Sequence, residues 1–181
     1  MRKVVAAINL TIDGFCDHTA GIADEEIHDH YTALLNNSDV ILYGRTTYEL
    51  MQFWQTLLEK PSGEQSMDDF AKVIDRIPKI IFSTTLKDTG WATATLADEP
   101  LKETVLKLKQ QSGGDILIGC RSLIDALANL NLIDEYQLCI HPVIIGKGLP
   151  LFDQINERTV FKLLKTKIFG AGATLLYYQR A

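Results

Sequence analysis

Short runs of apolar residues alternate along this chain with longer segments in which apolar side chains recur every three or four positions. The short runs are typical of buried strands, and the recurring pattern is typical of helices that bury one face. We therefore predict strands at 3–9, 40–43, 79–83 and 113–117, with a further short strand within 91–96. The intervening segments predict helices at 24–36, 46–58, 67–75, 100–111 and from Gly119 to about Asn129.

The pattern changes near the C-terminus, where no helix is predicted. Residues 135–141 alternate like a strand and continue into a glycine loop at 142–148, and further strands are predicted at 161–168 and 174–179. Strands separated by helices imply a parallel sheet, whereas successive strands joined by turns imply antiparallel pairs. We expect one α/β domain over residues 1–181. Its central sheet is mixed but mostly parallel, flanked by helices, with antiparallel C-terminal strands.

Composition narrows the range of partners. The 181 residues fit one domain with a full core, and the net charge is −5 with no basic run, so we expect no nucleic-acid partner. The apolar run at the N-terminus breaks off at Asn9, too short for a signal peptide, and no window predicts a membrane span. The cysteines Cys16, Cys120 and Cys139 are too widely spaced for a disulfide framework or a zinc site. We expect a cytoplasmic protein without a membrane partner or a metal.

The most informative segment places Gly119 between the strand predicted at 113–117 and the helix that follows. The first turn of a helix has backbone N–H groups without partners and lies at the positive end of the helix dipole, which suits a phosphate. A simple connection between strand and helix also needs a glycine about as often. One glycine alone leaves both interpretations open.

A second junction of this kind follows the strand at 40–43, where the sequence reads Gly44-Arg45-Thr46-Thr47. The arginine can bind a phosphate through two parallel hydrogen bonds, and the threonine hydroxyls add donors. The alternative is a glycine turn with a threonine cap and a solvated arginine.

Hydroxyl groups also end the third strand, as Ser83-Thr84-Thr85. Taken alone they favour a simple turn with a capping hydroxyl over a ligand site. However, the carboxyl ends of parallel strands meet at one edge of a sheet, where α/β proteins bind ligands. Three strand ends suited to anions favour a ligand with several phosphates, such as a dinucleotide.

Long loops lie at two other places in the sequence. The first strand leads into about a dozen residues that contain Asp13-Gly14-Phe15, a loop length that is often functional, as in a lid. Asp13 is either a catalytic carboxylate or an acceptor within its own turn. In the later loop, Gly146 and Gly148 flank Lys147, which has either a substrate-side role or an exposed position in a turn.

These motifs, in this order, resemble those of the dihydrofolate reductase-like superfamily. The closer resemblance is to its riboflavin-biosynthesis reductase branch, the RibD C-terminal domain family, and it spans essentially the whole chain. It is carried by Asp13-Gly14-Phe15, Gly44-Arg45-Thr46-Thr47-Tyr48-Glu49, Ser83-Thr84-Thr85, the segment 113–119, Asp134-Glu135 and the segment 142–148. The resemblance implies a dihydrofolate reductase-like fold, NADPH as the hydride donor and a homodimer.

The resemblance also implies roles for particular residues. The first helix-start motif would bind cofactor phosphate, the hydroxyls would lie near the 2′-phosphate, and the turn after 113–118 would bind the diphosphate beside the nicotinamide. The residues concerned are Gly44, Arg45, Thr46 and Thr47; Ser83 and Thr84; and Gly119, Cys120, Arg121, Ser122 and Leu123. Cys120 and Arg121 stand where the family usually has adjacent glycines.

Asp13 lies in the segment that matches the loop over the nicotinamide, so Asp13 or a bound water is the candidate proton donor, and a carboxyl in that role needs a raised pKa. Asp24 and Glu25 lie where true dihydrofolate reductases carry a substrate-binding carboxylate, and they serve equally well as first-turn helix acids.

We therefore expect an NADPH-dependent reductase that resembles 5-amino-6-(5-phosphoribosylamino)uracil reductase and acts on a pyrimidine- or pteridine-like small molecule. Dihydrofolate reductase activity is one alternative. A non-catalytic, nucleotide-binding relative is the other. The deaminase motifs that usually accompany the riboflavin enzyme are not found in this sequence.

Overall fold

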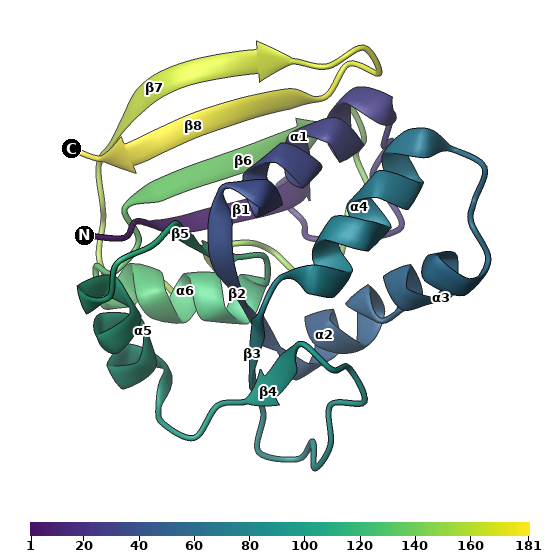
Figure 1. Ribbon diagram of the computed structural model, residues 1–181. Coiled ribbons are helices and arrows are strands. Elements are labelled where there is room, and N and C mark those ends of the chain that lie inside the picture. Colours follow the sequence, from purple (N-terminus) through teal and green to yellow (C-terminus); the bar gives the residue numbers. More distant parts are fainter.

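All strands of the protein join one eight-stranded sheet (Figure 1). The computed structural model describes residues 1–181. The strands follow the order β4-β3-β2-β5-β1-β6-β8-β7, parallel from β4 to β6 and antiparallel beyond it. Their bounds are β1 (Val4–Thr11), β2 (Ser38–Gly44), β3 (Lys79–Phe82), β4 (Ala94–Leu96), β5 (Asp115–Ile118), β6 (Glu135–His141), β7 (Phe161–Ile168) and β8 (Thr174–Arg180). The predicted mixed sheet is confirmed.

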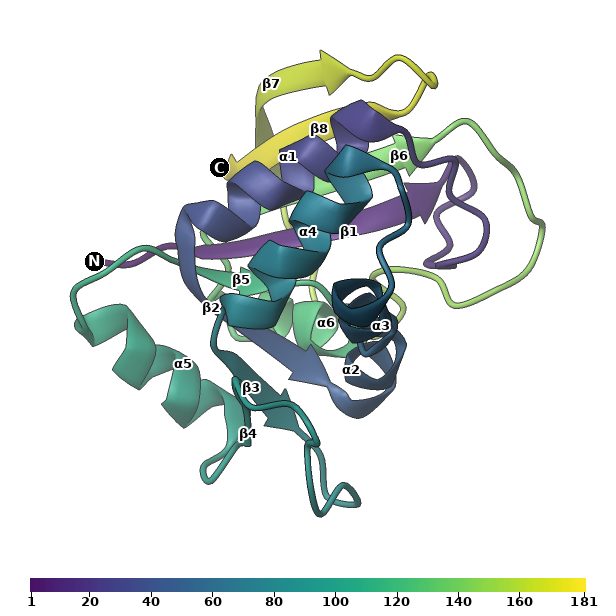
Figure 2. The ribbon, with the colours of Figure 1, turned by 45° about the vertical axis from the view of Figure 1, so that its right-hand side comes forward.

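Helices cover both faces of this sheet (Figure 2). They are α1 (Glu25–Asn36), α2 (Arg45–Met51), α3 (Phe53–Glu59), α4 (Gln65–Arg76), α5 (Leu101–Gln110) and α6 (Arg121–Asn129). Helices α1, α2 and α4 contribute to the core on one face, and α5 and α6 to the core on the other. None of these helices combines the length and apolar character needed to cross a membrane.

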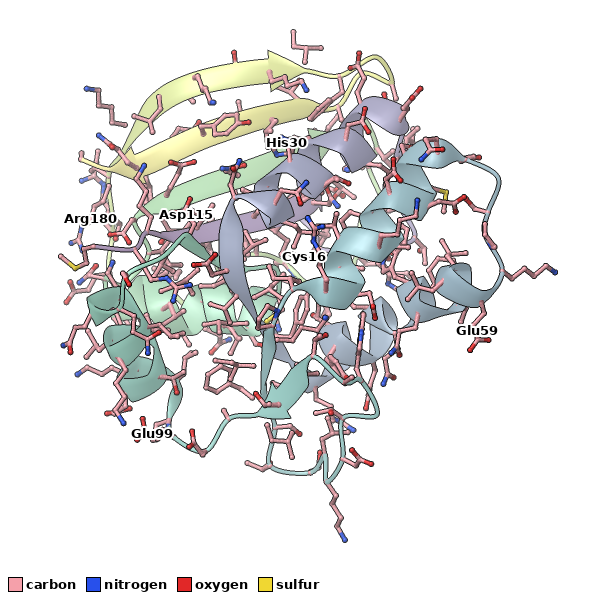
Figure 3. The ribbon with its side chains drawn as sticks, viewed as in Figure 1. Cys16, His30, Glu59, Glu99, Asp115 and Arg180 are labelled. Atoms are coloured by element: carbon pink, nitrogen blue, oxygen red, sulfur yellow. The ribbon has the colours of Figure 1, made fainter.

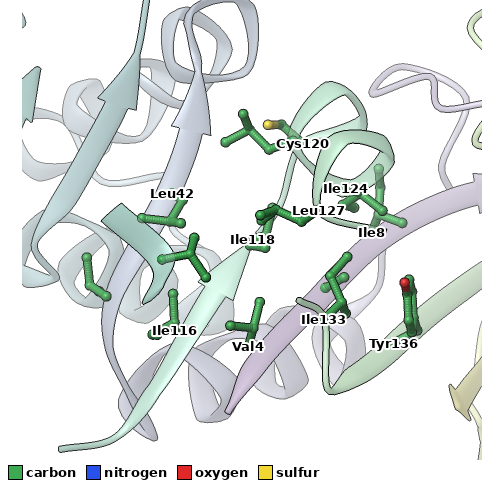
Figure 4. Close-up of a cluster of buried hydrophobic side chains, with 14 of the residues drawn as sticks. Val4, Ile8, Leu42, Ile116, Ile118, Cys120, Ile124, Leu127, Ile133 and Tyr136 are labelled. Carbon is green, nitrogen blue, oxygen red and sulfur yellow. The ribbon is translucent and has the colours of Figure 1, made fainter. Parts of the chain in front are cut away.

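The alternation of side chains along the central strand β1 explains its uninterrupted apolar sequence. Val4, Ala6 and Ile8 face the core that contains α6, as Figure 4 shows for Val4 and Ile8. Val5 and Ala7 face the opposite core, together with α1 and α4. Because successive residues of a strand point to opposite faces, a strand buried on both faces is apolar at nearly every position.

The prediction of one continuous helix at 46–58 is wrong, because the segment forms two helices, α2 and α3, that are divided at Gln52. The Tyr48 hydroxyl and the Gln52 side-chain amide both donate to the backbone carbonyl of Thr89, at 2.6 and 3.2 Å. The Gln55 N–H donates to the Gln52 carbonyl, a tighter turn than an α-helix makes. The helix is thus interrupted where it contacts the loop between β3 and β4, and local helix propensity does not reveal this interruption.

The parallel strands end at a common edge of the sheet, as predicted. β1 ends at Thr11, β2 at Gly44, β5 at Ile118 and β6 at His141, so the segments that follow them meet there. We refer to this side as the carboxyl edge. The candidate motifs all follow strands that end at this edge.

Candidate cofactor site

Two strand–helix junctions adjoin at the carboxyl edge. The Gly44 N–H, at the end of β2, donates to the Sγ of Cys120, the N-cap of α6, at 3.2 Å. A Cβ atom on Gly44 would lie 3.3 Å from Ser122 Oγ, so the absence of a side chain allows this approach. Neither α2 nor α6 has a side-chain hydrogen bond at its N-cap, which leaves first-turn N–H groups available to an anion.

Cys120 links these junctions without being a reactive thiol. It is buried, and its Sγ lies 4.0 Å from Ser122 Oγ. Burial raises the pKa of the Cys120 thiol above its usual value, against the opposing effects of the Gly44 N–H, which donates to Sγ, and of the nearby Leu123 backbone. The thiol therefore stays protonated and fills the space between the two turns.

The next residue, Arg121, directs its side chain to a different part of the molecule. Its Nη1 donates to the Pro150 carbonyl at 3.3 Å and to Asp153 Oδ2 at 3.4 Å, and lies 3.7 Å from Asp125 Oδ2. The Leu123 side chain is buried in the core. Neither side chain is therefore free to contact a cofactor, and only the backbone N–H groups of Arg121 and Leu123 could do so. Their role in cofactor binding stays a prediction.

Beside these junctions lies a pocket of about 590 Å³, between the start of α2 and the ends of β3 and β4. It brings Arg45 together with Ser83, Thr84 and Thr85, although the two segments are far apart in the sequence. The Arg45 guanidinium is half-exposed, 3.7 Å from the Glu49 carboxylate. A guanidinium beside hydroxyl groups is the chemistry that binds a phosphate monoester.

The hydroxyl groups near this pocket differ in how far the protein already uses them. Ser83 Oγ accepts hydrogen bonds from the backbone N–H groups of Thr85 and Leu86, at 3.2 and 3.0 Å. Thr84 and Thr46 are exposed and have no partner in the protein, and Thr47 lies close to the Cys120 thiol. Thr84 and Thr46 are therefore free to bind a ligand.

Asp13 has a structural partner in the later loop. Its Oδ2 accepts from the Gly146 N–H at 2.7 Å and from the Ile145 N–H at 3.2 Å. Hydrogen bonding with Thr11 and with these backbone groups lowers the pKa of the Asp13 carboxyl. A proton donor needs the opposite shift, so in this geometry Asp13 anchors a loop, and its catalytic role stays an untested prediction.

The loops after β1 and β6 are paired along much of their length, at the right of Figure 2. The Cys16 N–H donates to the Leu149 carbonyl at 2.8 Å, and the Leu151 N–H to the Gly14 carbonyl at 3.1 Å. Gly148 has a φ of 157°, and a Cβ there would lie 3.2 Å from Phe15 Cβ. The glycines of 142–148 thus serve contact between the two loops.

A buried histidine that the sequence did not mark as functional organises the same region. The N–H of Ile22 donates to His141 Nδ1 at 3.1 Å, so neutral His141 carries its proton on Nε2 and donates it to Asn9 Oδ1, also at 3.1 Å. Asn9 Oδ1 also accepts from the Tyr31 hydroxyl at 2.9 Å. Burial lowers the pKa of His141. Its partners lie 119 and 132 residues away in the sequence, which is why no local motif revealed them.

The candidate substrate carboxylates near the start of α1 are used by the fold. Asp24 is the N-cap of α1, accepting from the Ile27 N–H at 2.9 Å through Oδ1. Its Oδ2 accepts from the Ala171 N–H at 2.8 Å, in the turn between β7 and β8. Glu25 is exposed in the first turn of α1. Asp24 therefore stabilises a helix start and a hairpin turn at once.

Comparison with known proteins identifies relatives over nearly the whole chain. A model of the family described as RibD C-terminal domain matches residues 2–175. YyaP, an uncharacterised protein of Bacillus subtilis (strain 168), is 34% identical over 181 residues, which cover 98% of this chain and 94% of YyaP.

Among solved structures, a putative riboflavin biosynthesis protein from Shewanella sp. PV-4 is similar with a TM-score of 0.74 and 19% identity, over 100% of this chain and 99% of that one. The dihydrofolate reductase of Enterococcus faecalis, complexed with NADP(H), is similar with a TM-score of 0.63 and 13% identity, over 98% of this chain and 96% of that one. These likenesses confirm the dihydrofolate reductase-like fold.

Proposed function

The chain belongs to the RibD C-terminal domain family, and from that premise we propose that it is an NADPH-dependent reductase of a small pyrimidine- or pteridine-like molecule, similar to 5-amino-6-(5-phosphoribosylamino)uracil reductase. One observation carries the proposal. Two uncapped helix starts adjoin at Gly44 and Cys120, beside a pocket that holds Arg45 and Thr84.

The residues present fit an NADPH molecule at this edge. The Arg45 guanidinium and the Ser83 and Thr84 hydroxyls would hold the 2′-phosphate, and the free N–H groups that begin α2 and α6 would hold the diphosphate. When bound, the dihydronicotinamide supplies a hydride to an electrophilic carbon of the substrate.

The paired loops after β1 and β6 would hold such a ring in position and exclude water from it. The proton that must accompany the hydride would come from a water at the carboxyl edge and not from Asp13. Hydrogen bonding lowers the pKa of the Asp13 carboxyl, which makes it a poor proton donor. Asp24 is likewise committed to Ile27 and Ala171, so it argues against dihydrofolate as the substrate.

Titration of the protein with NADPH and with NADH, followed by nucleotide fluorescence, tests the proposal. We expect Arg45→Ala to weaken NADPH binding on the order of 10- to 100-fold, the effect of losing a charge-assisted hydrogen bond, and to change NADH binding much less. Lys60→Ala is the matched control, because Lys60 is exposed at the end of α3 and has no ion-pair partner.

Three results would argue against parts of this proposal. If the protein does not bind NADPH at millimolar concentration, NADPH is not its cofactor. Equal losses for NADPH and NADH in Arg45→Ala would show that Arg45 does not contact the 2′-phosphate. Cofactor that binds but is never oxidised by a broad panel of pyrimidines and pteridines, dihydrofolate included, would favour the non-catalytic alternative.

We also propose the homodimer that the resemblance implies. β7 is an edge strand of the sheet, and its Leu163, Leu164 and Ile168 side chains are exposed. Edge strands with exposed apolar side chains are available for pairing with a second chain. Sedimentation equilibrium of the intact protein measures the assembly directly.

A further inference from the structure

A second cavity, of about 470 Å³, lies away from the carboxyl edge. It is formed by the C-terminal end of α6, the start of β6, the segment before β7 and the end of β8, and it shares no residue with the Arg45 pocket. Tyr136 is the second residue of β6, whereas His141 at the carboxyl edge is the last. In Figure 3, Arg180 marks this side of the molecule, close to both chain termini shown in Figure 1.

Three aromatic side chains meet in this cavity. The ring of Tyr136 lies 6.0 Å from that of Phe152 and 4.9 Å from that of Phe161, centre to centre, in edge-to-face arrangements. Tyr136 is only 4% exposed, yet its hydroxyl has no hydrogen-bond partner in the protein. The hydroxyl oxygen itself is not buried, so it is open to solvent and to a ligand in the cavity.

Two arginines lie at the rim without a carboxylate partner. Arg158 is exposed and forms no hydrogen bond or ion pair with another residue. Arg180 donates to the Asn131 side-chain carbonyl, and it forms no ion pair with Glu157, the acidic residue of the same cavity. Two guanidinium groups that have no paired charge form a site suited to a carboxylate or a phosphate.

One strained backbone residue lines the same cavity. Two non-glycine residues of this chain have positive φ, and both line the cavity. Asn131 (φ 55°) ends α6 in the usual way, since its N–H donates to the Ala128 carbonyl and the Leu132 N–H to the Leu127 carbonyl, whereas Phe152 (φ 64°) is a bulky residue in a loop. A left-handed backbone is uncommon for a bulky residue such as phenylalanine. The Phe152 N–H donates to the buried Asp125 at 3.0 Å, which holds the ring in the cavity. Strain of this kind gathers at ligand-binding sites, where the surrounding structure maintains it.

From these observations we propose that the cavity is a second ligand site, for a planar aromatic acid. The ring packs among Tyr136, Phe152 and Phe161, and its carboxylate or phosphate pairs with Arg158 and Arg180. The volume lies within the range of pockets that bind small molecules. This site is independent of the cofactor proposed for the carboxyl edge.

Isothermal titration with 2-naphthoate tests the site, since this probe combines a flat ring with a carboxylate. We expect one saturable site per chain, about tenfold or more weaker in the double variant Arg158→Ala/Arg180→Ala. Binding should be unchanged in Lys60→Ala, which removes one positive charge next in sequence to Glu59, and Figure 3 shows Glu59 on the opposite side of the molecule from Arg180. It should also be unchanged in Arg45→Ala, which alters the other pocket.

Two related compounds separate the contributions of the ring and the charge. Cyclohexanecarboxylate, which lacks the aromatic ring, and 2-naphthalenemethanol, which lacks the charge, should each bind more weakly than 2-naphthoate. Absence of binding, equal binding by the double variant, or loss of binding in Arg45→Ala would each overturn the proposal. So would a change of sedimentation mass in the double variant, because the arginines would then serve an interface between copies of the chain.

Discussion

The two halves of the carboxyl edge differ in what satisfies their polar groups. In the cofactor half, formed by residues 44–47, 83–85 and 119–122, helix N–H groups lack caps and the Thr84 hydroxyl has no partner. In the loop half, formed by residues 9–24 and 141–151, Asp13 and His141 are both hydrogen-bonded within the protein. Polar groups that are paired within the protein hold the fold together, whereas exposed groups without a protein partner stay free to bind a ligand. The comparison separates residues that bind from residues that hold the site together.

The strongest test of this division is the removal of His141. We expect His141→Ala to lower the free energy of unfolding by about 3 kcal/mol, because a buried ring is lost and the Ile22 N–H and Asn9 Oδ1 each lose a partner. Urea unfolding measures the change. His18→Ala is the control, since His18 is exposed in the same loop and its removal should change stability by less than about 0.5 kcal/mol. Similar small losses in both variants would show that the loop half does not depend on the His141 cluster.

The pH dependence of the free energy of unfolding provides a second test of the role of His141. Burial lowers the pKa of His141 from its ordinary 6.5 in the folded state, against opposing effects of Ile22 and Asp24. The unfolded chain therefore binds more protons, so this contribution to stability is present above pH 6.5 and is lost as the pH falls below it. His141→Ala should remove that part of the dependence. If the free energy of unfolding of the variant depends on pH as steeply as that of the unchanged protein, the dependence arises from other groups.

The same division explains how much the sequence could predict. The cofactor half is encoded in contiguous motifs, such as Gly44 to Thr47, each directly after a strand, so periodicity and motif order were sufficient to place them at one edge. The loop half depends on pairs such as Asp13 with Gly146, 133 residues apart. Only the folded sheet brings such residues together, and a single sequence carries no signal for their contact.

Side-chain direction was a further limit of prediction. Arg121 occupies a predicted position at the start of α6, yet its guanidinium binds Pro150 and Asp153 in the distant loop. The break between α2 and α3 has a similar cause, since it coincides with contacts to Thr89, 37 residues from Gln52. Position along a motif was therefore predictable, whereas the target of each side chain was set by tertiary contacts.

Asp13 permits a test of whether the loop half is structural or catalytic. We expect Asp13→Ala to speed amide hydrogen exchange at Ile145 and Gly146 about tenfold, because their acceptor is lost. Asp13→Asn should change exchange much less, since an amide oxygen can still accept from both N–H groups. Nuclear magnetic resonance of the two variants measures the rates.

Once a substrate is known, the same pair separates positioning from proton transfer. A positioning role predicts that Asp13→Asn keeps most of kcat while Asp13→Ala loses it. Equal loss of kcat in both variants, with exchange in Asp13→Asn still slow, would instead make Asp13 a proton donor.

The smallest expected effect is at Thr84 and concerns binding alone. Thr84 is exposed and its hydroxyl has no partner in the protein, so Thr84→Val should leave the urea midpoint unchanged. If the cofactor half is built for NADPH, the same change should weaken NADPH about fivefold, the effect of one hydrogen bond, and Thr84→Ser should restore it. If Thr84→Val lowers the urea midpoint and leaves the affinity for NADPH unchanged, Thr84 stabilises the fold and does not bind the cofactor. Because Ser83 already accepts two backbone hydrogen bonds, Ser83→Ala would alter both properties, which makes Thr84 the cleaner probe of an open polar group.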